Sequence, residues 1–241
     1  MAARALRGIF FDIDDTLYST RDFARLARRN AVEAMVRLGV RLPPEKLYDE
    51  LTEVVREFSS NYDHHFDKLL TRLPSEATAG INRALIVAAS VAAYHDTKNA
   101  SLKPFDGAVA LLTALSRTPI VRGVITDGLQ IKQAEKLIRL GLVPLLSPDA
   151  VFISDQIGIS KPNPKLYRRA LADTGLRPEE TIYVGDDPVN DVDPAHEVGM
   201  ITCLFTGVAR EHRPGVSTPA YSVADFATLG EILRREFGVH G

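Results

Sequence analysis

The chain has 241 residues, of which 25% are charged and 45% hydrophobic, and its formal net charge is −2. These values are typical of a globular protein with a substantial core, and they give no general attraction to nucleic acid or to an anionic membrane. A single cysteine, Cys203, excludes an intrachain disulfide and a cysteine-based metal cluster. Since no apolar stretch approaches the roughly 20 residues needed to span a bilayer, we expect a cytoplasmic protein.

The first predicted element is a short uncharged apolar run at residues 8–11. Such a run is typical of a strand that is buried on both faces of a parallel sheet. Asp12, Asp14, Asp15 and Thr16 follow it directly. Carboxylates are seldom buried unless they are paired, bound to a ligand or functional, although Asp and Thr are also common at solvated strand ends and helix N-caps. This stretch alone leaves both interpretations open.

The pattern from residue 20 to about residue 97 is helical. Apolar residues recur at three- and four-residue steps, and Gly39, Pro43 and Pro74 separate the runs. The last run, at about 79–94, is nearly all apolar, so we expect it to be buried between its neighbours. Because no strand-like alternation interrupts these runs, the sequence predicts a helical domain at residues 19–100, inserted after the first strand.

Strands and helices alternate after residue 104, which predicts βαβ units, a parallel sheet and an α/β fold. We expect this three-layer, Rossmann-like core to comprise residues 1–18 and 101–241. Residues 207–219 are rich in Pro, Gly and Thr and are predicted to form a surface loop. The predicted strands are 121–126, 150–154, 181–185 and 200–205, and the predicted helices are 105–117, 129–140, 164–174, 194–198 and 225–237.

Polar residues follow the carboxyl end of each of the first four predicted strands. In an open parallel sheet these ends form one edge, where ligands bind. We therefore expect the polar residues to converge on one site. In chain order they are Asp12, Asp14, Asp15 and Thr16, then Thr126, Asp127 and Gly128, then Asp155, Ser160 and Lys161, then Asp186, Asp187 and Asp191.

The residue types at these ends indicate phosphate chemistry. Clustered carboxylates without His or Cys favour a hard cation with oxygen ligands, above all Mg²⁺. The Thr126 hydroxyl and the backbone N–H groups of Asp127 and Gly128 can bind phosphate oxygens, and Lys161 adds a positive charge. One carboxylate can attack phosphorus while a second serves as general acid and base.

These motifs resemble those of the haloacid dehalogenase-like hydrolase superfamily. The resemblance rests on Asp12-x-Asp14-x-Thr16, Thr126, Lys161-Pro162 and Gly185-Asp186-Asp187-x-x-x-Asp191, which occur in order over essentially the full chain. The helical insertion after the first motif is similar to the cap of small phosphatases in that superfamily. The resemblance therefore implies an α/β catalytic core with an inserted helical cap.

The resemblance also implies roles for the residues that would handle phosphate. Asp12 would be the nucleophile and a Mg²⁺ ligand. Asp14 would be the general acid/base and would offer the metal its backbone carbonyl. Thr16 would steady the aspartate loop, while Thr126 and the backbone of Asp127 would hold the phosphoryl group.

The remaining motif residues would complete the metal and phosphate site. Lys161 would hold Asp12 and the phosphate in register. Asp186 would ligate Mg²⁺ directly, and Asp191 would act through bound water. Either Asp191 or Asp187 could instead cap the following helix, and which of the two is the outer metal contact is left open.

The sequence thus favours a Mg²⁺-dependent phosphomonoester hydrolase that acts on a small phosphorylated metabolite, with no nucleic acid or membrane as partner. The alternatives are a 2-haloacid dehalogenase, a phosphomutase and a non-catalytic phosphoacceptor or binding module. Asp14 argues for phosphate, because carbon–halogen cleavage requires neither a metal nor a proton donor, and a phosphoacceptor has no use for an acid/base. The oligomeric state is left open, a homodimer included.

Overall fold

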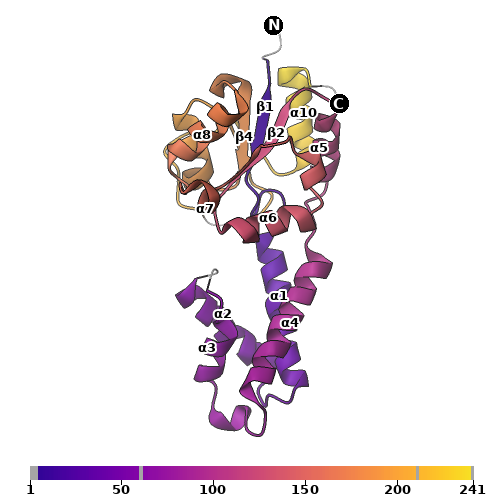
Figure 1. Ribbon diagram of the computed structural model, residues 1–241, viewed down its shortest axis with the longest axis vertical. Coiled ribbons are helices and arrows are strands. Elements are labelled where there is room, and N and C mark those ends of the chain that lie inside the picture. The colour runs from indigo at the N-terminus through magenta and orange to yellow at the C-terminus, as the bar shows by residue number, and fades with distance from the viewer. Residues whose placement is uncertain (1–4, 60–61, 210–211, 240–241) are drawn as a thin grey trace. The chain divides into compact units, whose positions relative to one another are not determined.

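The computed structural model describes residues 5–59, 62–209 and 212–239 (Figure 1). The chain divides into two compact units, one formed by Met1–Ser19 with Lys103–Gly241 and the other by Thr20–Leu102. These boundaries lie within two residues of the predicted ones. The assignment of the units as catalytic core and cap stays a prediction.

A six-stranded parallel sheet forms the centre of the first unit, with strand order β3-β2-β1-β4-β5-β6. The α/β fold predicted from the sequence is confirmed. The prediction omitted β6, because three residues after an irregular segment give too short a pattern. The strands are β1 Gly8–Phe11, β2 Val121–Thr126, β3 Val151–Ile153, β4 Thr181–Gly185, β5 Ile201–Phe205 and β6 Tyr221–Val223.

Helices cover both faces of this sheet, with α5 and α10 on one face and α8 and α9 on the other (Figure 1). Consecutive residues of β1 face opposite sides of the sheet. Phe10 packs edge-on against Phe152 in the core cluster beneath α8, whereas Phe11 packs against Phe226 of α10. The helices of this unit are α5 Ala108–Ser116, α6 Gln130–Arg139, α7 Ser154–Ile157, α8 Pro164–Thr174, α9 Asp193–Glu197 and α10 Phe226–Phe237.

The second unit is helical, as predicted, and consists of α1 Thr20–Arg37, α2 Pro44–Phe58, α3 His65–Arg72 and α4 Arg83–Ser101. Helices α1 and α4 lie side by side along most of their length (Figure 1). Their neighbours α2 and α3 complete a small apolar core around residues such as Met35, Leu51 and Leu69.

The prediction that the last helix of this unit is buried between its neighbours was wrong. Helix α4 begins at Arg83, and Leu85 and Val91 are 57% and 37% exposed. Among the α4 residues whose burial is described, only Ile86, Ser90 and Thr97 are buried. An apolar composition reduces the contrast between the two faces of a helix, so it does not reveal how many faces are covered.

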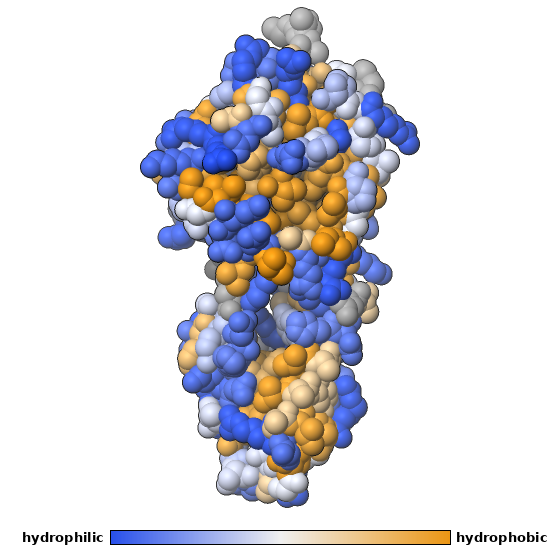
Figure 2. All heavy atoms as spheres, viewed as in Figure 1, coloured by the Kyte–Doolittle hydropathy of each residue, from blue (hydrophilic) through white to orange (hydrophobic). Residues whose placement is uncertain are grey.

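Polar and charged side chains cover much of the surface seen in Figure 2, with apolar patches between them. Within the described ranges, every helix is too short or too polar to cross a membrane. Cys203 lies in β5 and is 1% exposed. Residues 206–209 and 212–219 form no helix or strand, in agreement with the predicted loop, of which residues 210–211 lie outside the described part of the chain.

Candidate active site

The carboxyl ends of β1 and β4 bring two of the motif loops together. The amide of Asp12, the first residue after β1, donates to the carbonyl of Val184 at 2.8 Å, so the strand pairing continues to the position of the carboxylate. Asp186 is the first residue after β4, and Asp191 lies in η4, a π-helical turn at Pro188–Val192. The parallel register of the two strands therefore fixes where these carboxylates meet.

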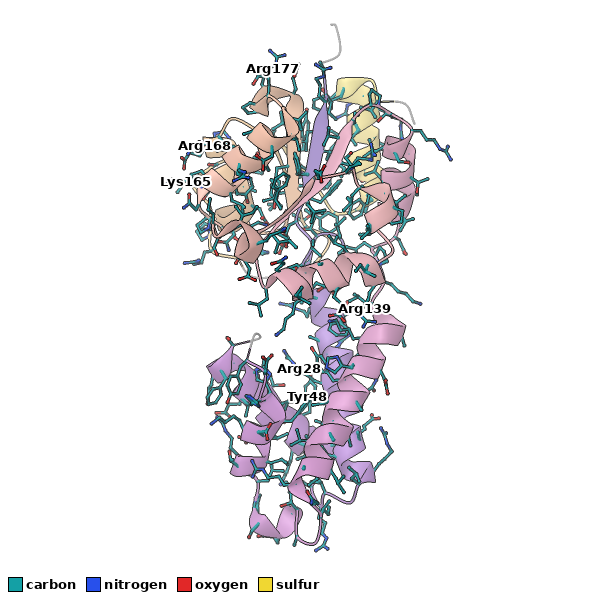
Figure 3. The ribbon with its side chains drawn as sticks, viewed as in Figure 1. Arg28, Tyr48, Arg139, Lys165, Arg168 and Arg177 are labelled. Atoms are coloured by element: carbon teal, nitrogen blue, oxygen red, sulfur yellow. The ribbon has the colours of Figure 1, made fainter. Side chains whose placement is uncertain are left out.

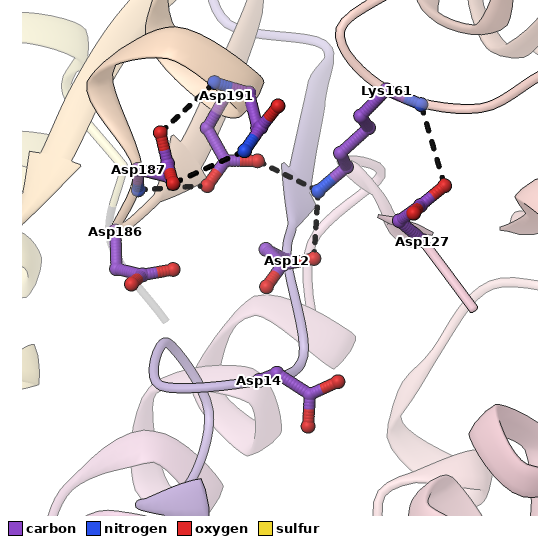
Figure 4. A pocket seen from close by; sticks show the side chains of 8 residues that line it. Asp12, Asp14, Asp127, Lys161, Asp186, Asp187 and Asp191 are labelled. Carbon is purple, nitrogen blue, oxygen red and sulfur yellow. Dashed lines mark hydrogen bonds and ion pairs between the residues drawn. The ribbon is translucent and has the colours of Figure 1, made fainter. Parts of the chain in front are cut away.

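Lys161 lies between two of these carboxylates (Figure 4). Its Nζ is 2.7 Å from Oδ1 of Asp12 and 2.6 Å from Oδ1 of Asp191. It also donates to the hydroxyl of Tyr183 at 2.7 Å. The side chains of Lys161, Asp12 and Asp191 are 5%, 9% and 2% exposed, so this is a buried ion-pair network.

Asp12, Asp186 and Asp191 form a group suited to a metal ion. One carboxylate oxygen from each lies within 4.8 Å of the others, and all three residues are buried. Three carboxylates against the single ammonium of Lys161 leave an excess of negative charge away from water, which is unfavourable unless a cation compensates it. Because all the donors are oxygens, they fit a hard divalent cation such as Mg²⁺.

The excess charge changes the acidity of the two central groups. Burial, together with the nearby carboxylates of Asp191 and Asp14, raises the pKa of Asp12 to about 7, although Lys161 opposes this effect. Burial alone would lower the pKa of Lys161, but Asp12 and Asp191 hold it well above its ordinary value. Lys161 is therefore a permanent cation, while Asp12 gains a proton more readily than an exposed aspartate.

Two hydroxyls in the motif loops are buried without a partner in the described part of the chain. The Oγ1 atoms of Thr126 and Thr16 are inaccessible to solvent, and neither has a hydrogen-bond partner among the described residues. An unsatisfied buried hydroxyl costs about 1–3 kcal/mol, so a ligand oxygen that meets it recovers this free energy. The hydroxyl of Thr16 thus makes no bond to the aspartate loop that it was expected to steady.

The hydrogen bonds of the loop after β2 differ in part from those predicted. The Asp127 carboxylate accepts a hydrogen bond from the amide of Lys161 at 3.3 Å, which joins the second and third motif loops. The amide of Gly128, expected to face phosphate, instead donates to Oγ of Ser154 at 2.9 Å. Asp155 accepts from the amide of Gln130 at the start of α6, so its carboxylate caps that helix.

Asp187 acts as a cap in this structure. Its Oδ1 accepts hydrogen bonds from the amides of Val189 and Asn190, at 2.9 and 3.1 Å, at the start of η4. These bonds lower the pKa of Asp187 despite its partial burial. Asp191 points inward instead, towards Lys161, and accepts from the amide of Asp187 at 3.0 Å. Of the two interpretations left open for Asp187, the geometry favours the cap.

Asp14 lines a pocket of about 190 Å³ together with Asp12, Lys161, Asp186 and Asp191. Its carboxylate points away from the group formed by Asp12, Asp186 and Asp191 (Figure 4). It is held by Lys136, whose Nζ lies 2.6 and 2.7 Å from the two carboxylate oxygens. The Asp14 carboxylate is thus engaged by Lys136 and is not part of the group of Asp12, Asp186 and Asp191.

Several residues of the site were not predicted from the sequence. Tyr183 lies within an apolar strand, and the only signal was that a buried tyrosine requires a partner for its hydroxyl. Lys136 lies on α6, with nothing in the sequence to distinguish it from a solvated lysine. The ring nitrogens of His212 lie 3.7 Å from Oδ2 of Asp186 and 3.6 Å from Oδ2 of Asp187, a contact made by a loop with no sequence pattern.

Comparison with known proteins agrees with this geometry. The family model of haloacid dehalogenase-like hydrolases matches residues 9–205, which include every motif described above. The chain belongs to this family. Resemblance to it was the prediction from the motifs, and that prediction is confirmed.

Curated relatives narrow the class of enzyme. The chain is 44% identical over 199 residues to the glyceraldehyde 3-phosphate phosphatase of Methanopyrus kandleri, covering 82% of each chain. It is 39% identical over 240 residues to the protein of the same name from Pyrococcus furiosus, covering 98% of this chain and 96% of that one. The prediction of a hydrolase of the phosphatase class is confirmed.

Solved structures agree in fold. The HAD-hydrolase YfnB of Bacillus subtilis superimposes with a TM-score of 0.68 at 21% identity, covering 95% of this chain and 99% of that one. At this level of identity the similarity supports the α/β fold and not a substrate.

Proposed function

We propose that the chain is a Mg²⁺-dependent phosphomonoester hydrolase that forms an aspartyl-phosphate on Asp12, with Asp14 as general acid and base. The observation that carries the proposal is the convergence of Asp12, Asp186 and Asp191 within 4.8 Å beside the ammonium of Lys161. A buried nucleophile, an excess of carboxylates and a fixed cation are what phosphoryl transfer requires in one place.

The metal would be held by the side chains of Asp12 and Asp186 and by the backbone carbonyl of Asp14, with Asp191 acting through bound water. When bound, Mg²⁺ would offset the charge of the phosphate oxygens and of the carboxylates around them. Lys161 would hold Asp12 and one face of the phosphoryl group. Thr126, Thr16 and the backbone of Asp127 would bind the phosphate oxygens.

In the first step, a carboxylate oxygen of Asp12 attacks phosphorus as the bond from phosphorus to the substrate oxygen breaks. Asp14 gives its proton to that leaving oxygen, so the products are a free alcohol and a phosphorylated Asp12. The arrangement divides one difficult displacement into two easier ones.

In the second step, Asp14 removes a proton from water, and the resulting oxygen attacks the phosphorus of the aspartyl-phosphate. The bond between phosphorus and Asp12 breaks, which releases inorganic phosphate and restores the Asp12 carboxylate. Asp14 is protonated again and ready for the next substrate.

The substrate class that we propose is a small phosphorylated metabolite, with glyceraldehyde 3-phosphate as the first candidate. The names of the relatives at 37–44% identity support this choice. The helical unit Thr20–Leu102 would serve as the cap that admits a particular leaving group. Residues of this unit would contact the leaving group, whereas the core would bind the phosphoryl group that all substrates share.

Phosphate release tests the proposal. Purified protein is assayed with glyceraldehyde 3-phosphate, sugar phosphates, nucleotides and p-nitrophenyl phosphate, with Mg²⁺ and with a chelator. We expect Mg²⁺-dependent release from at least one small phosphomonoester, its loss in D12N, and its retention in D173N, which removes an exposed aspartate. Chloride release from a 2-haloacid, transfer of phosphate within a sugar, or a stable phosphoprotein without turnover would support an alternative instead.

A further inference from the structure

At least three side chains hold the Asp14 carboxylate. The ammonium of Lys136 lies 2.7 Å from Oδ1 and 2.6 Å from Oδ2. The amide nitrogen of Gln133 donates to Oδ2 at 3.0 Å, and the Tyr18 hydroxyl donates to Oδ1 at 2.5 Å. Both oxygens are thus engaged, although the Asp14 side chain remains 30% exposed at the pocket.

Lys136 and Gln133 are one turn apart on α6, so they face the same side of that helix. Gln133 is 4% exposed, and its amide nitrogen also donates to the carbonyl of Asp127 at 2.7 Å. The side chain of Lys136 is 18% exposed. Helix α6 therefore connects the acid/base candidate to the loop that would hold phosphate.

The charges show what Lys136 adds. The ammonium of Lys136 and the hydrogen bonds from Tyr18 and Gln133 all favour the charged form of the Asp14 carboxylate. When Asp14 gives up a proton, a negative charge develops on its carboxylate. A cation fixed 2.6–2.7 Å away stabilises that charge without having to reorganise.

We infer that Lys136, assisted by Gln133, is a positioning residue for the acid/base step. It holds the Asp14 carboxylate at the edge of the pocket and stabilises the charge that appears there as the proton moves to the leaving oxygen. The inference rests on the proposed role of Asp14. It assigns α6 a part in the reaction that no sequence motif of the chain indicates.

A pair of substrates of similar shape separates this role from simple structural support. Phenyl phosphate and p-nitrophenyl phosphate differ mainly in how strongly their leaving oxygens require a proton. The ratio of kcat/KM for phenyl phosphate to that for p-nitrophenyl phosphate therefore reports the proton transfer. A variant that merely contains less folded or less metal-bound enzyme loses activity on both substrates by the same factor, so the ratio does not change.

We expect K136M to lower this ratio by roughly tenfold, a modest part of the 10²- to 10⁴-fold that a well-placed general acid contributes. K136R, which keeps the charge, is expected to recover part of the ratio, and Q133L to lower it less than K136M does. K165M removes an exposed lysine of α8, which points outward in Figure 3, and is expected to leave the ratio unchanged.

A double variant completes the test. In a D14N background, K136M is expected to have no further effect on the ratio, because the group that it positions is already disabled. Equal losses on both substrates in K136M, or an undiminished effect in the D14N background, would overturn the inference while leaving the proposed function intact. Wild-type enzyme that hydrolysed neither of these esters nor any other small phosphomonoester of the assay above would overturn both.

Discussion

The ammonium of Lys161 lies 2.7 Å from a carboxylate oxygen of Asp12 and 2.6 Å from one of Asp191, although 149 and 30 residues of sequence separate these partners. The contact joins the loop after β1, the loop before α8 and the turn after β4. A buried cation between two buried anions means that each of the three depends on the other two. The proposed chemistry depends on this relationship.

Removal of the Lys161 charge should therefore affect both stability and activity. K161M leaves two buried carboxylates without their shared cation, and breaking a buried pair in this way costs about 3–5 kcal/mol. We expect a lower free energy of unfolding by chemical denaturation and an activity at least 100-fold below wild type. K165M is the matched control for net charge and should resemble wild type. A K161M protein as stable and active as that control would contradict the account.

Metal binding should depend on pH because of Asp12. The metal-free carboxyl has a pKa raised to about 7, so below that pH a bound cation must displace a proton. We expect Mg²⁺ affinity to fall by about tenfold per pH unit below pH 7 and to level off above it. Calorimetry in two buffers of different ionisation enthalpy should show proton release at pH 6 and little at pH 8.5. A Mg²⁺ affinity that rises as the pH falls would contradict this prediction.

Gly185 leaves room for Asp191. A Cβ at this position would lie 2.4 Å from the Asp191 carboxylate, closer than any real contact allows. We expect G185A to displace that carboxylate, to lower activity at least tenfold and to weaken Mg²⁺ binding. Gly141 serves as the control. A Cβ there meets nothing within 4 Å, so the positive φ of Gly141 is the only source of strain in G141A. If G141A lost metal affinity as G185A does, the effect would not come from contact with Asp191.

Asp187 and Asp191 should have separable roles. D187A removes the cap of η4, a loss that typically costs 0.5–2 kcal/mol of stability. We expect it to lower the unfolding free energy by about 1 kcal/mol while Mg²⁺ affinity changes less than in D191N. D191N should weaken Mg²⁺ binding strongly. Thermal unfolding with and without Mg²⁺ measures both quantities, and the reverse order of affinities would make Asp187 the metal partner.

Much of the fold follows from local pattern. Residues 8–11, 121–126 and 181–185 were predicted as strands with the bounds that the structure shows, because each is rich in apolar or β-branched residues and is followed directly by polar ones. Helix α7 and β6 have four and three residues, too few to show a period. The exposure of α4 depends on which neighbours reach it, and the sequence does not contain that information.

Some contacts of the candidate site also follow from the sequence, and others do not. The convergence of Asp12, Lys161 and Asp186 follows from the rule that parallel strands end at one edge of the sheet. The contact between Lys136 and Asp14 does not follow from that rule, because it depends on how α6 is placed against the loop after β1. His212 reaches the site from an irregular loop, where no periodic pattern exists to interpret.

The most direct measurement of the central claim is a crystal structure of the protein with Mg²⁺ and beryllium fluoride, which mimics a phosphoryl group on an aspartate. The account predicts one Mg²⁺ at about 2.0–2.1 Å from oxygens of Asp12 and Asp186. It also predicts the fluoride group on the other oxygen of Asp12, beside Lys161 and Thr126. A cation that does not touch both aspartates, or a fluoride group on any other residue, would contradict it.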